Sequence, residues 1–398
     1  MSTSTLTTLL ASVRSALATP SSLLPSTSSD QQARLDLIDL LPELNAALIG
    51  DTAHLRELAW SAIHVLPLAA ISRWKLASHV PLDGEITYHE LSSKTGISSP
   101  LLKRILRHAM TSRLFLELPS GEISHSPTSR LLVTNDGLAA FVDLHTETAL
   151  KSIAHTLDAL ERWPESTDPR EGGYSLALGR GGETSVYEEV AKDEGRMVGF
   201  GRAMRFFSEG EGYEVGSLVE GYAWGRIGKG VVVDVGGANG FASAAISKAF
   251  PELEMVVQDI QDMKVEYPGA NIRWMVHDYF TPQPVVGADV YLYRFVFHNL
   301  YDEKAVEVLR AAVPALKKKG ARILINDECL SEPGKVRWRN ERAARGLDAI
   351  MLACMSGRER ESSDWEGLFE KADPRYKFLS AKIAPQSRLW LIEAEWTG

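Results

Sequence analysis

Short apolar runs alternate with amphipathic helical patterns through the C-terminal half of the chain. A short β-branched run bounded by turn residues is typical of a buried strand, and apolar residues at i, i+3 and i+4 are typical of a helix packed on it. The strand-like runs are 231–233, 255–257, 272–276, 289–293, 322–325, 378–383 and 389–394, and the helical patterns are 241–250, 304–316, 338–355 and 364–371. This alternation predicts a doubly wound α/β sheet, which the last two runs finish as an antiparallel pair.

The N-terminal half is predicted to be mainly helical. Apolar residues at helical spacing indicate helices over 34–48, 54–76, 141–163, 183–207 and 215–224. Leu6 and the leucines that follow it at helical spacing predict one more helix, whose apolar face would pack on another surface. A Ser/Pro-rich stretch at 20–33 is interpreted as a linker.

Residues 86–124 have the pattern of a helix-turn-helix with a wing. A helix over 88–95 is followed by Gly96, a second helix with Pro100 in its first turn, and short strands over 115–117 and 122–124. Such a module can bind DNA, and the second helix carries basic residues for it: Lys103, Arg104 and Arg107. Nearby glutamates and a formal net charge of −9 favour a scaffold or dimerisation role without nucleic acid.

Composition limits the class of protein. The hydrophobic content of 44% in 398 residues is that of a soluble globular protein, and no apolar run approaches the length of a membrane span. The two cysteines, Cys329 and Cys354, have neither a disulfide framework nor a metal-ligand spacing. We therefore expect a cytoplasmic protein. The predicted parts are N-terminal helices with the linker (1–50), the winged-helix domain (51–165) and the α/β domain (166–398).

The stretch 230–259 is predicted to bind a nucleoside. It contains a strand, the turn Gly236-Gly237, a helix and a second strand that ends in Asp259. In a βαβ unit of this kind, the glycines let the backbone approach the ligand and the acid accepts hydrogen bonds from a ribose diol. Asp234 precedes the glycines and would repel a pyrophosphate, but it suits an ammonium group. The pattern therefore favours S-adenosylmethionine over a dinucleotide.

Six short motifs, in this order, resemble those of the plant and fungal small-molecule O-methyltransferases. They are VDVGGANG, VQD, HDYF, YRFVFHN, NDECL and MSGRERESSDW, and the resemblance covers about residues 55–398. It implies a Rossmann-like methyltransferase sheet, S-adenosylmethionine as cofactor, a small-molecule acceptor with a hydroxyl group, and a homodimer formed through the winged-helix domain.

The resemblance and the strand pattern together select a candidate base. His298 ends an apolar run and should lie at the carboxyl end of the sheet, where a group with a pKa of about 6.5 can accept the acceptor's proton. Glu328 and Glu359 match the family's two acidic partners of this base. Glu359 also fits a surface ion-pair cluster. Because Asp327 and Glu361 lie one or two residues from Glu328 and Glu359, the sequence leaves open which acids match the family's two positions.

Other positions match the family's binding residues. The match implies cofactor contacts by Gly236, Gly237, Asp259, Asp278, Tyr279, Phe280 and Arg294, with Asp234 either at the cofactor's ammonium or capping the turn. Phe200 and Met204 lie one helical turn apart, so they either pack in the core or line the acceptor pocket. His145, His155 and His277 carry no such support, and no metal site is expected.

The chain departs from the family pattern near both sites. Ala238 replaces a third glycine, a mild change, and Asn299-Leu300 replace Asp-Trp after the histidine. Some fungal members of this fold bind the cofactor yet act as cyclases or pericyclases, with the sulfonium as a fixed positive charge. Since His298, Glu328 and Glu359 are all present, methyl transfer is the favoured reaction, and the cyclase or pericyclase remains the alternative.

Overall fold

The computed structural model describes residues 5–18, 27–210, 212–384 and 387–398. Its contacts divide the chain into two units. One unit is Met1–Ile63 with Gly334–Glu341, and the other is His64–Pro333 with Arg342–Gly398. Every strand that the structure describes belongs to the second unit.

The first unit is helical, with apolar residues on its surface. It contains α1 (Thr5–Ala18), α2 (Ser28–Ile49) and the beginning of α3 (Asp51–Arg73). α2 starts inside the predicted linker, because Thr27 and Asp30 form a capping box that supplies partners to the helix N-terminus. Residues 19–26 of that linker lie outside the described chain. Exposed leucines recur at helical spacing, namely Leu6, Leu9, Leu10 and Leu17, then Leu37, Leu40, Leu41, Leu44 and Leu48.

The second unit begins with a small helical module. α5 (Tyr88–Thr95) and α6 (Ser99–Thr111) pack beside a three-stranded antiparallel sheet in the order β1 (Glu85–Ile86), β3 (Ile123–Ser124), β2 (Leu116–Glu117). Arg107 donates from Nε and Nη2 to both carboxylate oxygens of Glu117 at 2.7 Å. One of the basic side chains considered above for DNA is therefore paired within the module.

One short helix, α4 (Leu76–His79), precedes this module, and a series of helices follows it and leads to the large sheet. The series is α7 (Pro127–Thr134), α8 (Asp136–Leu144), η2 (His145–Ala149), α9 (Leu150–Arg162), η3 (Pro169–Glu171), α10 (Gly173–Ala177), α11 (Val186–Val190), α12 (Glu194–Ser208), α13 (Val215–Gly221) and η4 (Trp224–Arg226). Two helices predicted to be continuous are interrupted. A π-helical turn, η2, breaks 141–163, and Asp193 breaks 183–207 because its side chain caps α12 by accepting the Arg196 N–H at 2.8 Å.

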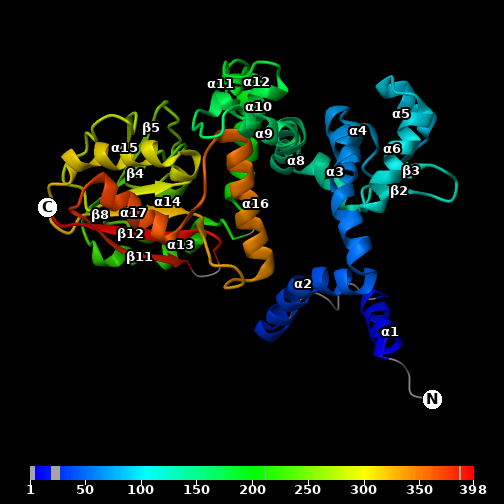
Figure 1. Cartoon of the computed structure of the whole chain (residues 1–398), viewed down its shortest axis with the longest axis horizontal. Coiled ribbons are helices and arrows are strands. Elements are labelled where there is room, and N and C mark those ends of the chain that lie inside the picture. The colour runs from blue at the N-terminus through cyan, green and yellow to red at the C-terminus, as the bar shows by residue number, and fades with distance from the viewer. Residues whose placement is uncertain (1–4, 19–26, 211, 385–386) are drawn as a thin grey trace. The chain divides into compact units, whose positions relative to one another are not determined.

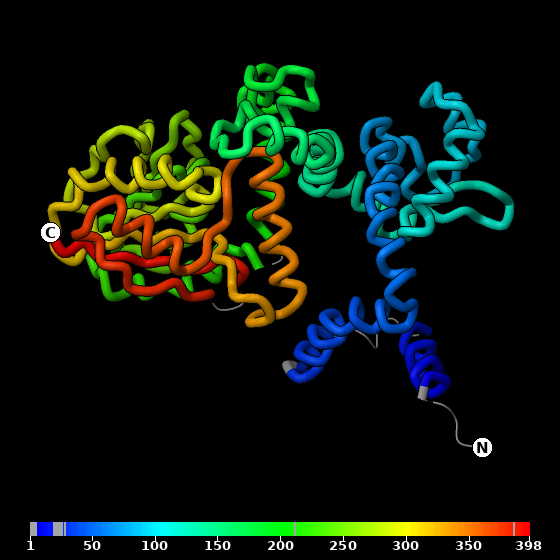
Figure 2. The backbone as a smooth tube through the Cα atoms, in the orientation of Figure 1, coloured from blue at the N-terminus to red at the C-terminus, as the bar shows by residue number. Residues whose placement is uncertain are grey.

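Seven strands form the large sheet, in the order β11-β12-β8-β7-β4-β5-β6 (Figures 1 and 2). They are β4 (Val231–Val235), β5 (Glu254–Asp259), β6 (Ile272–Val276), β7 (Val290–Arg294), β8 (Arg322–Asp327), β11 (Tyr376–Ile383) and β12 (Trp390–Trp396). The first five are parallel, whereas β12 runs antiparallel to β8 and to β11. The order reverses on either side of β4, so the carboxyl end of β4 lies at a switch point where ligands bind in such sheets.

Helices cover both faces of this sheet (Figure 1). Alternate residues of a strand point to opposite faces. Tyr291 and Ile323 therefore pack with α15 (Asp302–Ala312) and α17 (Ser362–Ala372), whereas Leu292 and Leu324 pack with α13 and with α14 (Phe241–Ala249). The remaining elements are α16 (Trp338–Met355) and a short parallel pair, β9 (Cys329–Leu330) with β10 (Arg360–Glu361).

This architecture confirms the predicted fold class, a helical N-terminal region followed by a mostly parallel doubly wound sheet with an antiparallel end. Within the described ranges, no helix combines the length and the apolar character that crossing a bilayer requires.

Candidate active site

The glycine turn after β4 is a place where only glycine fits. Gly236 and Gly237 both donate their N–H groups to the Gln258 carbonyl, at 2.9 and 3.0 Å. Gly236 has a φ of +72°, and a Cβ there would lie 2.9 Å from Val296 Cγ2. A Cβ on Gly237 would lie 2.7 Å from Asp234 Cγ. The backbone of the turn therefore packs directly against Val296 and Asp234, with no room for a side chain at either glycine.

Asp259 closes this turn from the neighbouring strand. One carboxylate oxygen accepts the Ala238 N–H at 3.0 Å and the other accepts the Ile260 N–H at 2.8 Å. Asp259 is the last residue of β5 and is only half-buried, so its carboxylate is partly accessible at the carboxyl end of the sheet. Ala238 itself has a φ of +48°, a left-handed conformation that costs a non-glycine residue about 1 kcal/mol. Replacing the family's third glycine is thus a less mild change than the sequence indicated.

Asp234 lies beneath the turn. It is 1% exposed, and its carboxylate accepts a hydrogen bond from Ser243 Oγ at 2.6 Å. Burial raises the pKa of Asp234 to about 6, although the Ser243 bond and the charge of Arg294 oppose the shift. Its visible partner is therefore α14, and contact with a bound ammonium stays a prediction.

The segment after β6 adds aromatic surface at the same edge of the sheet. Asp278 is exposed and accepts the Phe280 N–H at 2.9 Å, which fixes the local turn. The rings of Tyr279 and Phe280 are 4.9 Å apart, and Tyr279 reaches the neighbourhood of Gly236. A glycine floor, a half-exposed carboxylate and adjacent aromatic rings fit a nucleoside, as the sequence predicted for S-adenosylmethionine.

Arg294, the last residue of β7, is buried among polar and aromatic groups. Its guanidinium donates to Asn326 Oδ1 and to the Tyr213 carbonyl, and it lies 5.1 Å from the centre of the Phe295 ring. Burial lowers the pKa of Arg294 to about 10. Its Nε has no hydrogen-bond partner in the part of the chain that the structure describes.

His298 lies in a strained turn at the carboxyl end of β7. Phe295 has a φ of +54°, and the 3-10 turn η5 (Phe297–Asn299) follows it. The imidazole is 8% exposed, and its Nδ1 is 3.3 Å from Glu359 Oε1. Burial opposes a charge on this ring, but the Glu359 hydrogen bond and the neighbouring carboxylates outweigh burial, so the pKa of His298 is raised above 6.5.

Three buried carboxyl groups surround this histidine. Asp327 ends β8 and accepts the Phe297 N–H at 2.9 Å, and burial raises its pKa to about 6. Glu328 accepts a hydrogen bond from the Tyr213 hydroxyl at 3.2 Å; burial, with the charge of Glu359 added, raises its pKa to about 8. Glu328 is therefore largely protonated at neutral pH, and the carboxylate that accepts a hydrogen bond from the ring is that of Glu359.

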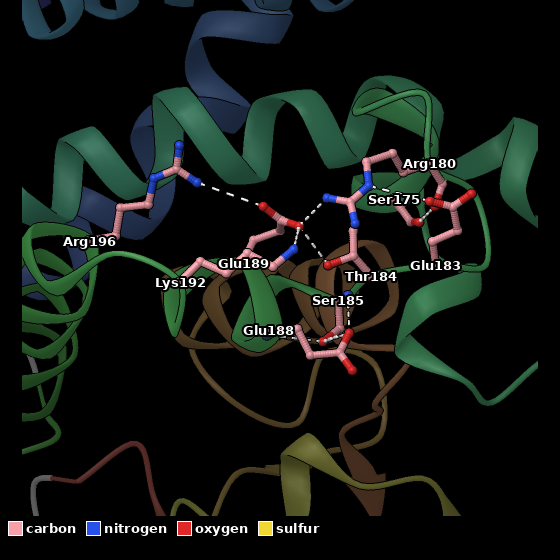
Figure 3. Close-up of polar contacts among 9 residues, drawn as sticks. All are labelled: Ser175, Arg180, Glu183, Thr184, Ser185, Glu188, Glu189, Lys192 and Arg196. Atoms are coloured by element: carbon pink, nitrogen blue, oxygen red, sulfur yellow. Dashed lines mark hydrogen bonds and ion pairs between the residues drawn. The ribbon is translucent and has the colours of Figure 1, made fainter.

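A second carboxylate cluster holds the segment ahead of α12. Figure 3 shows the side chains of Arg180, Lys192 and Arg196 converging on Glu189 of α11. Arg180 Nη1 donates to Glu189 Oε1 at 2.6 Å, and Thr184 Oγ1 donates to the same oxygen at 2.8 Å. Hydrogen bonds from Lys192 and Thr184 lower the pKa of Glu189 to about 2. This cluster ties 180–196 together.

The two predicted pocket residues lie on the helix that follows this cluster. Phe200 and Met204 are both half-buried on α12. The Phe200 ring meets the Tyr187 ring edge-on at 5.7 Å, and the Tyr187 hydroxyl donates to Asn299 Oδ1 at 3.2 Å. Phe200 is thereby linked to the turn that carries His298.

The structure thus brings His298, Glu328 and Glu359 into one buried group, and gathers the glycine turn, Asp259 and 278–280 at the same edge of the sheet. Sequence reasoning missed the contribution of Tyr213, because its signal is a single tyrosine far from any motif. It named Asp327 only as a neighbour of Glu328. Among the described residues, no group of three or more His, Cys, Asp or Glu side chains could hold a metal ion.

Comparisons with known proteins agree with this geometry. A family model described as an O-methyltransferase domain matches residues 166–374. Chlorophenol O-methyltransferase of Trichoderma longibrachiatum is 36% identical over 377 residues, which cover 92% of this chain and 80% of that protein.

Solved structures with low sequence identity share the fold. OxaC in complex with SAH and oxaline gives a TM-score of 0.79 at 20% identity, covering 99% of this chain and 100% of that one. A structure described as a pericyclic reaction enzyme gives a TM-score of 0.73 at 20% identity, covering 98% and 100%.

Proposed function

Since this chain belongs to the O-methyltransferase family, we propose that it methylates a hydroxyl group of an aromatic or polyketide-type small molecule, with His298 as the general base. The family resemblance, the enzyme class and the cofactor S-adenosylmethionine that the sequence predicted are confirmed. The acceptor and the roles of individual residues are proposals.

The residues that would hold the cofactor are those at the carboxyl edge of β4, β5 and β6. When bound there, S-adenosylmethionine supplies an electrophilic methyl group on a sulfonium. Gly236 and Gly237 would provide the floor, Asp259 would accept hydrogen bonds from the ribose, and Tyr279 and Phe280 would contact the adenine. Asp278 holds the turn that carries these two rings. Asp234 and Arg294 would lie toward the amino-acid tail.

One observation carries the proposed reaction: a buried imidazole at the switch point, with a carboxylate on its Nδ1. A proton on Nδ1 donates to Glu359, which leaves the Nε2 lone pair free. As the acceptor oxygen forms its bond to the methyl group, the methyl–sulfur bond would break to leave S-adenosylhomocysteine, and the acceptor's proton would move to Nε2. The raised pKa of His298 stabilises the imidazolium that results.

Glu328 has a different part in this proposal. Because its pKa is about 8, Glu328 is largely protonated near pH 7. It then adds little negative charge beside the acceptor, and with Tyr213 it forms a wall behind the imidazole. Phe200 and Met204 would cover the acceptor from α12.

Substitution of His298 tests the base. His298→Gln and His298→Ala should lower methyl transfer to a phenol of ordinary acidity by about 10²–10⁴-fold. A chlorinated phenol, the class named for the Trichoderma relative, is more acidic and already partly ionised at neutral pH, so its loss should be smaller. Binding of S-adenosylhomocysteine, measured by calorimetry, should not change. Full methylation of the weakly acidic phenol by His298→Ala would contradict the assignment.

A cyclase or pericyclase that uses the cofactor without transferring its methyl is the second candidate. It is favoured by Asn299, which places a neutral amide next to His298 where the family has a carboxylate, and by the shared fold of the pericyclic reaction enzyme. Mass spectrometry of protein, cofactor and candidate polyketides distinguishes the two reactions. Isomer formation without S-adenosylhomocysteine would favour the cyclase.

We also propose a homodimer. Exposed apolar residues recur along α1 and α2 and continue into α3 at Leu55, Leu58 and Trp60, and clusters of this kind are typical of surfaces that bind another protein chain. The proposed dimerisation domain is 51–165 and the proposed cofactor domain is 166–398. Light scattering of the full chain and of a Leu55→Glu/Leu58→Glu variant, both at exposed positions of the proposed dimerisation domain, tests the dimer. Two free, buried cysteines fit the proposed cytoplasmic location.

A further inference from the structure

Arg360 is a fully buried cation whose contacts converge on the turn that carries His298. Its relative exposure is 0%. Nη1 donates to the Phe297 carbonyl at 2.9 Å and Nη2 donates to the Leu300 carbonyl at 2.6 Å. Nε donates to Asp302 Oδ1 at 3.0 Å. The guanidinium therefore connects the residue before His298, the residue two after it, and the first residue of α15.

The turn has few bonds of its own. Within it the Leu300 N–H reaches the Phe297 carbonyl at 3.0 Å, and the Asn299 N–H reaches the Val296 carbonyl at a long 3.4 Å. The left-handed Phe295 precedes it, a conformation that persists only when surrounding contacts determine it. Contacts from elsewhere in the chain must therefore fix the direction of the imidazole.

Asp327 and Tyr187 hold the backbone of Phe297 and the side chain of Asn299. The contacts to the imidazole and to the carbonyls of Phe297 and Leu300 come from one short segment, 357–360. Gly357 packs so closely on the turn that a Cβ would lie 2.5 Å from the His298 carbonyl oxygen. Glu359 contacts the imidazole, and Arg360 holds the two flanking carbonyls. The backbone of this segment is in turn fixed by β10, which pairs with β9 beside Glu328.

The chemistry of arginine suits this place. Burying a cation costs several kcal/mol, and burial lowers the pKa of Arg360. The planar guanidinium has donors in a fixed fork, so it can satisfy two carbonyls and a carboxylate at once. A lysine has a single ammonium and would not span both carbonyls. The Trp365 ring, 5.3 Å from the Arg360 Cζ, covers the remaining face.

We propose that Arg360 is a positioning residue for His298, acting through the carbonyls of Phe297 and Leu300 to hold the imidazole against Glu359. This inference rests on the proposed function, because the direction of the ring matters for catalysis only if His298 is the base. In this proposed role, Arg360 itself contacts neither the acceptor nor the cofactor.

Arg358 provides a matched control. It also lies near Asp302, with Nη1 3.4 Å from Oδ2, and it donates to Asp364 at 2.7 Å. Arg358 is 44% exposed, and it pairs with carboxylates rather than with the carbonyls of the turn. Arg358→Ala therefore removes a positive charge beside Asp302 without releasing the turn.

The first test compares Arg360→Lys with Arg358→Ala in single-turnover methyl transfer to a chlorinated phenol and to a weakly acidic phenol. A displaced base should cost about ten- to hundredfold in kcat on the weakly acidic phenol, with less loss on the acidic one. Arg358→Ala should stay within about threefold of the parent. S-adenosylhomocysteine affinity and Tm show whether each variant is folded. A folded Arg360→Lys with unchanged kcat on both phenols would overturn the proposal.

The second test asks whether Arg360 and Glu359 act as one unit. If Arg360 works by holding His298 on Glu359, then Glu359→Gln should add little further loss in the Arg360→Lys background. Multiplicative losses would indicate a merely structural Arg360 and would contradict the inference. Arg360→Ala should also regain activity when guanidinium chloride is added at concentrations far below those that denature.

Failure of this inference can be separated from failure of the proposed function. His298→Ala is measured in parallel, and full activity there would refute the base itself. An acceptor-free measurement gives the same distinction: the pKa of the His298 imidazole, followed by NMR in the protein with S-adenosylhomocysteine. Arg360→Lys and Glu359→Gln should both lower that pKa, whereas Arg358→Ala should not lower it. An unchanged pKa in Arg360→Lys would overturn the inference while leaving the base assignment intact.

Discussion

Two buried carboxylate clusters in this protein are built in opposite ways. Around Glu189, three cations and a hydroxyl surround one carboxylate and lower its pKa to about 2 (Figure 3). Around His298, three carboxyl groups share one imidazole, and burial raises the pKa of Glu328 to about 8.

The two clusters therefore differ in role: the cluster around Glu189 stabilises the fold, and the cluster around His298 stabilises a bound proton. An over-neutralised carboxylate stays ionised at every ordinary pH and joins neighbouring segments. Buried carboxyl groups that lack compensating cations favour the protonated form of a neighbouring imidazole, so they stabilise the imidazolium. We therefore expect substitutions in the first cluster to change stability and substitutions in the second to change rate and pH dependence.

The largest expected effect is that of Glu359→Gln. Its amide can hold His298 in the wrong tautomer and supplies no negative charge, so kcat should fall about 10²–10³-fold. The hydrogen bond and charge of Glu359 raise the pKa of His298, so the apparent pKa in the pH profile of kcat/KM should move downward. Glu366→Gln, at an exposed position of α17, is the control. If Glu359→Gln and Glu366→Gln have the same pH profile of kcat/KM, Glu359 does not set the pKa of His298 and the contrast between the two clusters fails.

Glu189→Gln should act on stability. It leaves Arg180, Lys192 and Arg196 facing one another without an anion, and we expect a loss of about 2 kcal/mol, which lowers Tm by several degrees. The expected loss in the free energy of unfolding is small because the side chains of the three cations are largely exposed to solvent. Differential scanning calorimetry measures it, with the exposed Glu188→Gln as control. A kcat loss as large as that of Glu359→Gln would show that the clusters are not separate in function.

The pH dependence of stability should have opposite signs in the two clusters. The pKa of Glu328 is raised from 4.5 to about 8, so its stabilising contribution is present at low pH and is lost as pH rises through 8. Glu328→Gln should therefore gain Tm relative to the parent between about pH 5 and pH 8, where the unfolded parent ionises this carboxyl group and the folded parent does not. The contribution of Glu189 is present above 4.5 and is lost as pH falls toward 2. A constant Tm difference for Glu328→Gln across that range would refute the raised pKa.

The smallest effects should come from the hydroxyl group in each cluster. Thr184→Val removes a donor from an ionised carboxylate and should cost about 1 kcal/mol in the free energy of unfolding. Tyr213→Phe removes a donor from a carboxyl group that is protonated near neutrality, so its cost at pH 7 should be lower. The hydrogen bond from Tyr213 lowers the pKa of Glu328, so that pKa should rise further in Tyr213→Phe. Denaturant unfolding at two pH values checks both, and a larger loss for Tyr213→Phe at pH 7 would contradict the ordering.

Sequence reasoning succeeded where the cause is local. The strand runs and glycine turn of 230–259 follow from neighbouring residues, and the structure has them within a few positions. It failed where a cap or a bulge interrupts a periodic pattern. Asp193 ends one expected helix because its side chain competes for backbone N–H groups, and the capping box at Thr27 starts another helix inside an expected linker.

The sequence by itself therefore determined the order of strands and helices, the nucleoside turn and the family, because periodicity, turn chemistry and motif order are written in consecutive residues. Only the tertiary structure decided which carboxyl group meets the imidazole. Glu359 lies 61 residues from His298 and reaches its ring, whereas Glu328 follows β8 directly and bonds Tyr213. The charges of these groups depend on burial and on partners from distant segments. These are properties of packing, so no single stretch of the chain contains them.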